Sequence, residues 1–212
     1  MRLNLGLAIM LVAAFVGCAG TNLEKQTQMA YNLTKEHFKN TATIKDDPLD
    51  TLATITTLNG FQFKYGRDTV LNDNFLRAFI NKKTGTTTIQ LYQVIYYHGG
   101  GWNFFQTINY ETPSGPEARR VKVISRNVDC SGSHYYGGCT YTEHLAFEIE
   151  EEFLRIIAAG YQPGQHVTWK FKFKAKSGRE YKDGMLPAEI AGFLEAIDAY
   201  RASCGLTNAA SK

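Results

Sequence analysis

Apolar and polar residues alternate along most of the chain after residue 46. A period of two places successive side chains on opposite faces of a strand, so it predicts strands with one buried face. Turn signals at Asn59-Gly60 and at residues 82–85 separate several of these runs and favour hairpins. We therefore expect about eight strands, at residues 51–58, 61–65, 75–81, 86–98, 102–110, 120–128, 141–149 and 167–175.

A period close to 3.6 marks two stretches nearer the C-terminus. Three glutamates at residues 150–152 suit a helix start, an apolar stripe of Phe153, Ile156 and Ile157 follows, and Gly160 is a plausible stop. A second helix is expected from Pro187 to about Gly205. Strands and helices do not alternate, which argues against a parallel doubly wound fold. The pattern predicts an α+β fold, a predominantly antiparallel β-sheet with two late helices packed on it.

The remaining segments are polar or too short to add a core. Residues 18–45 carry only scattered apolar positions, so we expect a tether that is helical in part. Residues 46–205 form the expected single strand-rich domain, and residues 206–212 a C-terminal tail.

The first 17 residues have the composition of a secretory signal. Arg2 supplies a positive charge, residues 3–16 are mostly apolar, and Gly17-Cys18-Ala19 ends the run. The run is too short to span a bilayer, which takes about 20 residues. Residues 15–18 resemble the lipobox of bacterial lipoprotein precursors, apart from Phe15, where leucine is commonest. The resemblance implies cleavage before Cys18, lipid on its thiol and, from Ala19, sorting to the outer membrane; the alternative is a secreted protein cleaved after Ala19.

Five stretches of the mature domain resemble a pattern in uncharacterised bacterial lipoproteins. They are residues 77–85 (RAFINKKTG), 90–92 (QLY), 101–105 (GWNFF), 139–144 (CTYTEH) and 186–194 (LPAEIAGFL). The resemblance covers much of the domain and implies no particular activity, because none of these motifs is a catalytic signature.

Composition supports strands and export but names no cofactor. Thirteen Phe and twelve Tyr favour strands, and a net charge of +3 is too small to indicate a nucleic-acid partner. Cys130 and Cys139 bracket a loop rich in glycine and serine, which predicts a disulfide in an oxidising compartment and leaves Cys204 unpaired. The alternative, a zinc site of Cys130, His134, Cys139 and His144, matches no compact zinc module. We expect no metal.

Candidate catalytic residues are few. Glu143 and His144 could form an acid/base pair, but neighbours on a strand point to opposite faces. We therefore expect a periplasm-facing lipoprotein with a non-enzymatic binding or envelope-assembly role. The alternative is a hydrolase or metal-dependent enzyme that uses His98, His134, Glu143 or His144.

One strand carries a stripe of positive charge. Lys170, Lys172 and Lys174 alternate with aromatic residues and share one face. Such a stripe is either a solvated face that blocks strand pairing or an anion-binding surface. The expected partners are the membrane, through lipid on Cys18, and either an anionic glycolipid or another envelope protein.

Overall fold

The computed structural model describes residues 20–65, 69–131 and 138–206. The expected signal peptide (residues 1–17), Cys18, His134 and residues 207–212 lie outside these ranges. The described residues form four helices and ten strands in two antiparallel sheets, so the expected α+β class is confirmed.

The two sheets differ in size. The larger has the order β1-β2-β3-β4-β8-β7, made of Thr43–Lys45, Leu52–Thr56, Asp73–Asn81, Thr87–Gly99, Cys139–Ile149 and Lys122–Asp129. The smaller has the order β10-β9-β5-β6, made of Glu180–Met185, Trp169–Ala175, Phe105–Thr112 and Gly115–Arg120. The helices are α1 (Gly20–Tyr31), α2 (Lys35–Thr41), α4 (Glu151–Ala159) and α5 (Pro187–Ser203). Both expected late helices are present.

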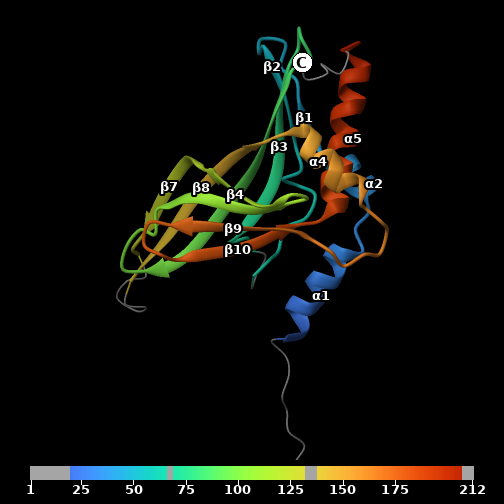
Figure 1. Cartoon of the computed structure of the whole chain (residues 1–212). Helices are drawn as coiled ribbons and strands as arrows, with labels where there is room; N and C mark the ends of the chain where they lie inside the picture. The colour runs from blue at the N-terminus through green and yellow to red at the C-terminus, as the bar shows by residue number, and fades with distance from the viewer. Residues whose placement is uncertain (1–19, 66–68, 132–137, 207–212) are drawn as a thin grey trace, which may run out of the picture.

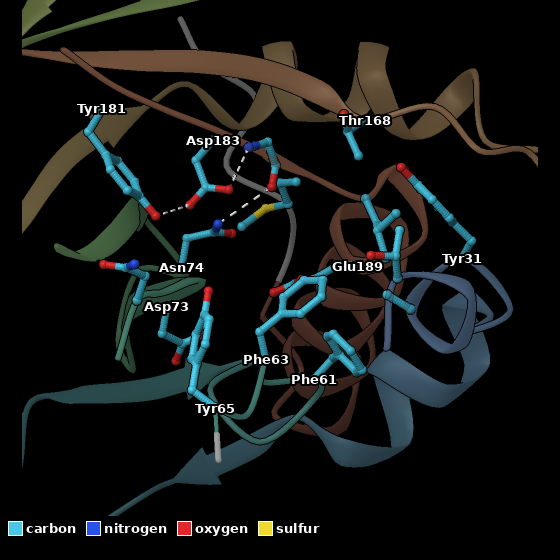
Figure 2. A pocket seen from close by; sticks show the side chains of 16 residues that line it. Tyr31, Phe61, Phe63, Tyr65, Asp73, Asn74, Thr168, Tyr181, Asp183 and Glu189 are labelled. Atoms are coloured by element: carbon cyan, nitrogen blue, oxygen red, sulfur yellow. Dashed lines mark hydrogen bonds between the residues drawn. The ribbon is translucent and has the colours of Figure 1, made fainter. Parts of the chain in front are cut away.

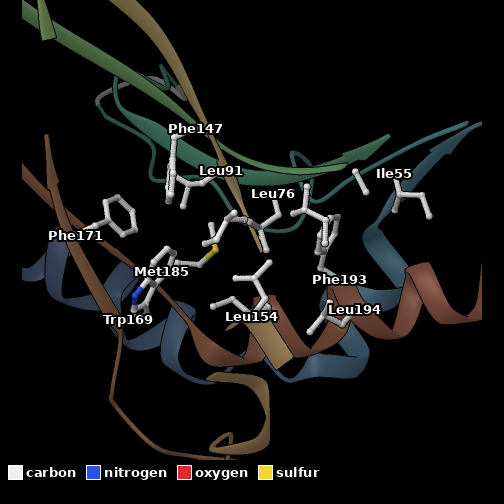
Figure 3. Packing of buried hydrophobic residues seen from close by; sticks show 14 of the residues in the cluster. Ile55, Leu76, Leu91, Phe147, Leu154, Trp169, Phe171, Met185, Phe193 and Leu194 are labelled. Atoms are coloured by element: carbon white, nitrogen blue, oxygen red, sulfur yellow. The ribbon is translucent and has the colours of Figure 1, made fainter. Parts of the chain in front are cut away.

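Helices and the small sheet share one face of the large sheet. Figure 1 shows α5 beside the β1–β3 side, while β9 and β10 run across the β4–β8 side. In Figure 3, Leu91 and Phe147 of the large sheet face Phe171 of the small sheet, and Leu76 faces Phe193 of α5. One hydrophobic cluster therefore joins both sheets and the helices.

Three expectations about the strands were wrong. Residues 61–65 form no strand and carry only an isolated bridge between Tyr65 and Thr69. The expected single sheet is two sheets, because β5 pairs with β6 and β9 rather than with β4. Strands β1, β6 and β10 were not expected; β6 begins at Gly115 and Pro116, residue types that are depleted in strands.

The expected stripe of α4 also needs correction. Leu154 is its fully buried residue, whereas Ile156 is 54% exposed. Trp169, Phe171 and Phe173 form the buried face of β9 as expected, and Val167 is exposed because it lies before the first residue of the strand.

Residues 35–45 belong to the packed domain and not to a tether. Phe38 of α2 is fully buried, and α2 lies against α5. The contact is close at Gly192, where a Cβ would collide with the carbonyl oxygen of Lys35. One buried aromatic ring and one glycine therefore allow a seven-residue helix to pack firmly.

Two of the cysteines are joined in a disulfide. Cys130 and Cys139 form a disulfide with a Cα–Cα distance of 4.3 Å, as expected, and Cys204 is free and exposed. Both thiols of the alternative zinc site are therefore consumed. No helix among the described residues has the length and apolar character needed to cross a membrane.

Candidate functional site

Glu143 is a structural carboxylate. Its side chain is fully buried and accepts four hydrogen bonds: from Tyr97 Oη at 2.8 Å, the backbone N–H groups of Phe104 at 3.0 Å and Phe105 at 3.3 Å, and Arg126 Nε at 3.0 Å. These bonds fix the start of β5 over β8 and hold Phe104 at a φ of 57°. With every contact used in this way, the carboxylate has no capacity left for an acid/base role.

His144 lies on the opposite face of the sheet, as expected. Its Nδ1 is 3.1 Å from Tyr92 Oη, and burial lowers its pKa. With Arg77 and Tyr92 it lines an open hollow on the outer face. His98 shares this face, but His144 pairs with Val94, four residues along β4, which corresponds to about 13 Å. Glu143, His144 and His98 therefore do not converge.

The lysine stripe lies on the outer face of the small sheet. Lys170 and Lys174 are exposed, and Lys172 Nζ is 2.9 Å from Glu180 Oε1. The strand register adds Lys182, which is opposite Lys172, and Arg120, which shares a row with Lys174 through Thr107. Folding thus widens a stripe of three charges into a basic face drawn from three strands.

A cavity of about 350 Å³ lies where β10 leads into α5. Helix α1, the segment before β3, β3 itself, β10 and the first turn of α5 all contribute to its lining (Figure 2). This is where the small sheet, the large sheet and the helices meet. Its labelled residues are Tyr31, Phe61, Phe63, Tyr65, Asp73, Asn74, Thr168, Tyr181, Asp183 and Glu189.

Two of the carboxyl groups lie together on the sheet side of the cavity. Asp183 accepts hydrogen bonds from Tyr181 Oη at 3.2 Å and from Gln93 Nε2 at 3.2 Å. The same Gln93 nitrogen donates to the backbone oxygen of Asp73, whose carboxylate accepts from Gln62 Nε2 at 3.2 Å. Burial raises the pKa of Asp73 to about 6; the charge of Asp183 acts in the same direction and the Gln62 bond opposes it.

The third carboxyl group comes from α5. Glu189 is 8% exposed, and Thr57 Oγ1 donates to its Oε1 at 2.5 Å. Burial raises the pKa of Glu189 to about 8, although a position in the first turn of a helix ordinarily favours a negative charge. Dehydration therefore outweighs the helix dipole here.

Helix α1 closes the cavity from the N-terminal side. Gln26 makes a paired contact with the backbone of Lys64, its Nε2 donating to the oxygen at 2.9 Å and its Oε1 accepting from the nitrogen at 2.8 Å. Tyr31 stacks on His166 with 4.5 Å between ring centroids. Helix α1 is thus docked on the domain through both polar and aromatic contacts.

Sequence reasoning missed this cavity. Its three carboxyl groups come from residues 73, 183 and 189, which no motif connects, and Glu189 has the pattern of an ordinary helix-start acid. Among the described residues, no three or more His, Cys, Asp or Glu side chains are grouped to hold a metal ion. Comparison with family models, curated proteins and solved structures finds no match.

Proposed function

We propose that this protein is a membrane-anchored lipoprotein of the bacterial periplasm whose domain binds a small molecule without transforming it. The anchor is lipid on Cys18, at the outer membrane, and the binding site is the cavity between β10 and α5. The cavity carries the proposal, because it is concave, aromatic and polar at a junction of sheets and helices, which is where ligand sites occur.

Binding is favoured over catalysis by the positions of the candidate catalytic residues. The alternative is a hydrolase or a metal-dependent enzyme. It would need at least two of His98, His134, Glu143 and His144 to lie close together in one site. Glu143 is inside the core and His144 outside it, and about 13 Å of strand separates His144 from His98.

The anchor is supported by the leader and by the position of α1. Helix α1 begins at Gly20, two residues after Cys18, and its residues Thr27, Ala30 and Tyr31 line the cavity. A lipid on Cys18 therefore places the cavity near the membrane surface.

The anchor is tested by intact mass spectrometry of the protein purified from membranes. We expect an acylated N-terminal Cys18, and a Cys18→Ser variant without lipid that no longer fractionates with membranes. An unlipidated N-terminus at Gly20 would show a soluble secreted protein and overturn the anchor.

The binding site is tested by native mass spectrometry of the same preparation. We expect a small non-covalent adduct on the wild-type protein and its loss in Thr168→Trp, which places an indole in the cavity. The matched control is Thr88→Trp, at an exposed position of β4. Absence of an adduct from the wild type, or an equal adduct on Thr168→Trp, would contradict binding in this cavity.

A further inference from the structure

The ionisable residues described in the lining of the cavity are all acidic groups. Its described ionisable residues are the carboxyl groups of Asp73, Asp183 and Glu189 and the phenols of Tyr31, Tyr65 and Tyr181. No lysine, arginine or histidine is among the lining residues that the structure describes. Carboxylates that line one partly dehydrated cavity attract a positive charge strongly, because the local dielectric constant is low.

Glu189 has bonding capacity that the protein does not use. Glu189 is only 8% exposed, and Thr57 donates a hydrogen bond to Oε1 alone. No residue in the described part of the chain donates a hydrogen bond to Oε2, and Figure 2 shows the side chain among those lining the cavity. Among the described residues, the buried side-chain atoms without a hydrogen-bond partner do not include Oε2, so this oxygen is reachable from the cavity. A donor supplied by a ligand would bind it in a largely dehydrated setting, where hydrogen bonds are strong.

Aromatic rings complete the lining. Phe61 and Phe63 pack edge to face with 5.1 Å between centroids, and Tyr65 and Tyr181 flank the two aspartates in Figure 2. Ring faces attract organic cations, and aromatic residues together with carboxylates are the groups that recognise ammonium ions in proteins. A bare metal ion fits less well, because the carboxyl groups are not grouped to share one.

We infer that the cavity binds an organic ammonium ion, a primary or quaternary amine with a small apolar body. Asp73, Asp183 and Glu189 provide the countercharge, and the rings of Phe61, Phe63 and Tyr181 cover the apolar part. This inference rests on the proposed binding function and specifies the chemical class of the ligand.

Ionisation of the carboxyl groups makes binding depend on pH. The pKa of Asp73 is raised to about 6 and that of Glu189 to about 8, so the cavity gains negative charge as the pH rises through this interval. The titratable groups facing these two, from each element around the cavity, are Asp183 and Tyr181 on β10, Tyr31 on α1 and Tyr65 before β3. Affinity for a permanently charged cation should therefore rise from pH 5.5 to pH 8.5.

The test measures binding of choline to the full chain purified from membranes in a nonionic detergent. Its uncharged isostere, 3,3-dimethylbutan-1-ol, is measured in parallel. We expect choline to bind at least about tenfold more tightly than the isostere at pH 8, since only choline interacts with the carboxylates. Asp73→Asn/Glu189→Gln should weaken choline at least about tenfold and remove the pH dependence. The control Asp50→Asn/Glu152→Gln changes the net charge equally at exposed positions and should bind as the wild type does.

Two competitors identify the source of the amine. Displacement of choline by glycerophosphoethanolamine indicates a lipid headgroup, whereas displacement by ethanolamine alone indicates a free soluble amine. Both results support the inference.

The failures can be told apart. Equal binding of choline and its isostere would overturn the ammonium inference and leave the cavity as a ligand site. If neither probe binds, the native adduct decides: an adduct without a positively charged or protonatable nitrogen overturns the ammonium inference alone. Absence of both probe binding and adduct overturns the proposed binding function as well.

Discussion

The carboxylate of Glu143 links the two sheets through hydrogen bonds. It belongs to β8 of the large sheet, yet it accepts the backbone N–H groups of Phe104 and Phe105 at the start of β5. Arg126, whose guanidinium carbon lies 4.8 Å from the ring centroid of Phe104, neutralises it from β7. A buried charge with four donors is expensive to disturb, because every donor loses its acceptor at once.

Glu143→Ala should therefore destabilise the fold. We expect the free energy of unfolding to fall by roughly 3 kcal/mol, measured by urea denaturation. Glu148→Ala is the control, because Glu148 is an exposed residue of the same strand. Unchanged stability of Glu143→Ala would show that the carboxylate is not structural.

Glu189 should make stability depend on pH. Its folded-state pKa is raised from 4.5 to about 8, so its contribution to stability is complete below about pH 4.5 and is lost as the pH rises through about 8. Asp73, also raised, acts in the same direction at lower pH.

Glu189→Gln removes this effect. The melting temperature of the variant minus that of the wild type should increase by several degrees from pH 5 to pH 9, since up to about 1.4 kcal/mol is involved per pH unit. Glu152→Gln, at an exposed position of α4, should show a constant difference. If the melting temperatures of Glu189→Gln and the wild type changed with pH in parallel, that would contradict a buried, protonated Glu189.

At the scale of elements, the basic face of the small sheet remains a candidate anion-binding surface. Lys170→Gln/Lys172→Gln/Lys174→Gln should lose most of its salt-dependent retention on vesicles that contain an anionic glycolipid, because three of the five cations are removed. The matched control is Lys45→Gln/Lys83→Gln/Lys122→Gln, which removes three exposed lysines elsewhere. Equal retention of the two variants would leave the stripe a solvated face.

The contact between α2 and α5 should tolerate no side chain at Gly192. Gly192→Ala forces the helices apart, since the new Cβ meets the carbonyl oxygen of Lys35. We expect a loss of roughly 1–3 kcal/mol in urea denaturation. Gly99→Ala should cost less, because no atom lies within 4 Å of a Cβ at Gly99. Equal losses would show that the α2–α5 contact is loose.

Local patterns predicted most elements and few of their partners. Alternation located β3, β4, β8 and β9, and the cysteine loop predicted the disulfide, because each depends on neighbours in sequence. The division into two sheets depends on which distant strand β5 joins, and no period encodes that choice. The burial of Phe38 was missed for the same reason. A single apolar residue in a polar helix does not indicate which distant element covers it, and here that element is α5.

At the scale of the molecule, both sheets and the helices share one hydrophobic cluster. A shared core predicts cooperative unfolding, because neither sheet keeps its buried face when the other separates. Tryptophan fluorescence, which includes Trp169 in the small sheet, and far-ultraviolet circular dichroism should give coincident urea transitions. Separate transitions would show two independently folding units.

The docking of α1 through Gln26 and Tyr31 limits how far the domain can reach. If Cys18 carries lipid as proposed, the connection between the lipid and the domain is not a flexible tether of 28 residues. It is a short link followed by a helix of 12 residues, about 18 Å long. The domain would then work at a nearly fixed height within a few nanometres of its own bilayer, and would meet partners that come to that surface.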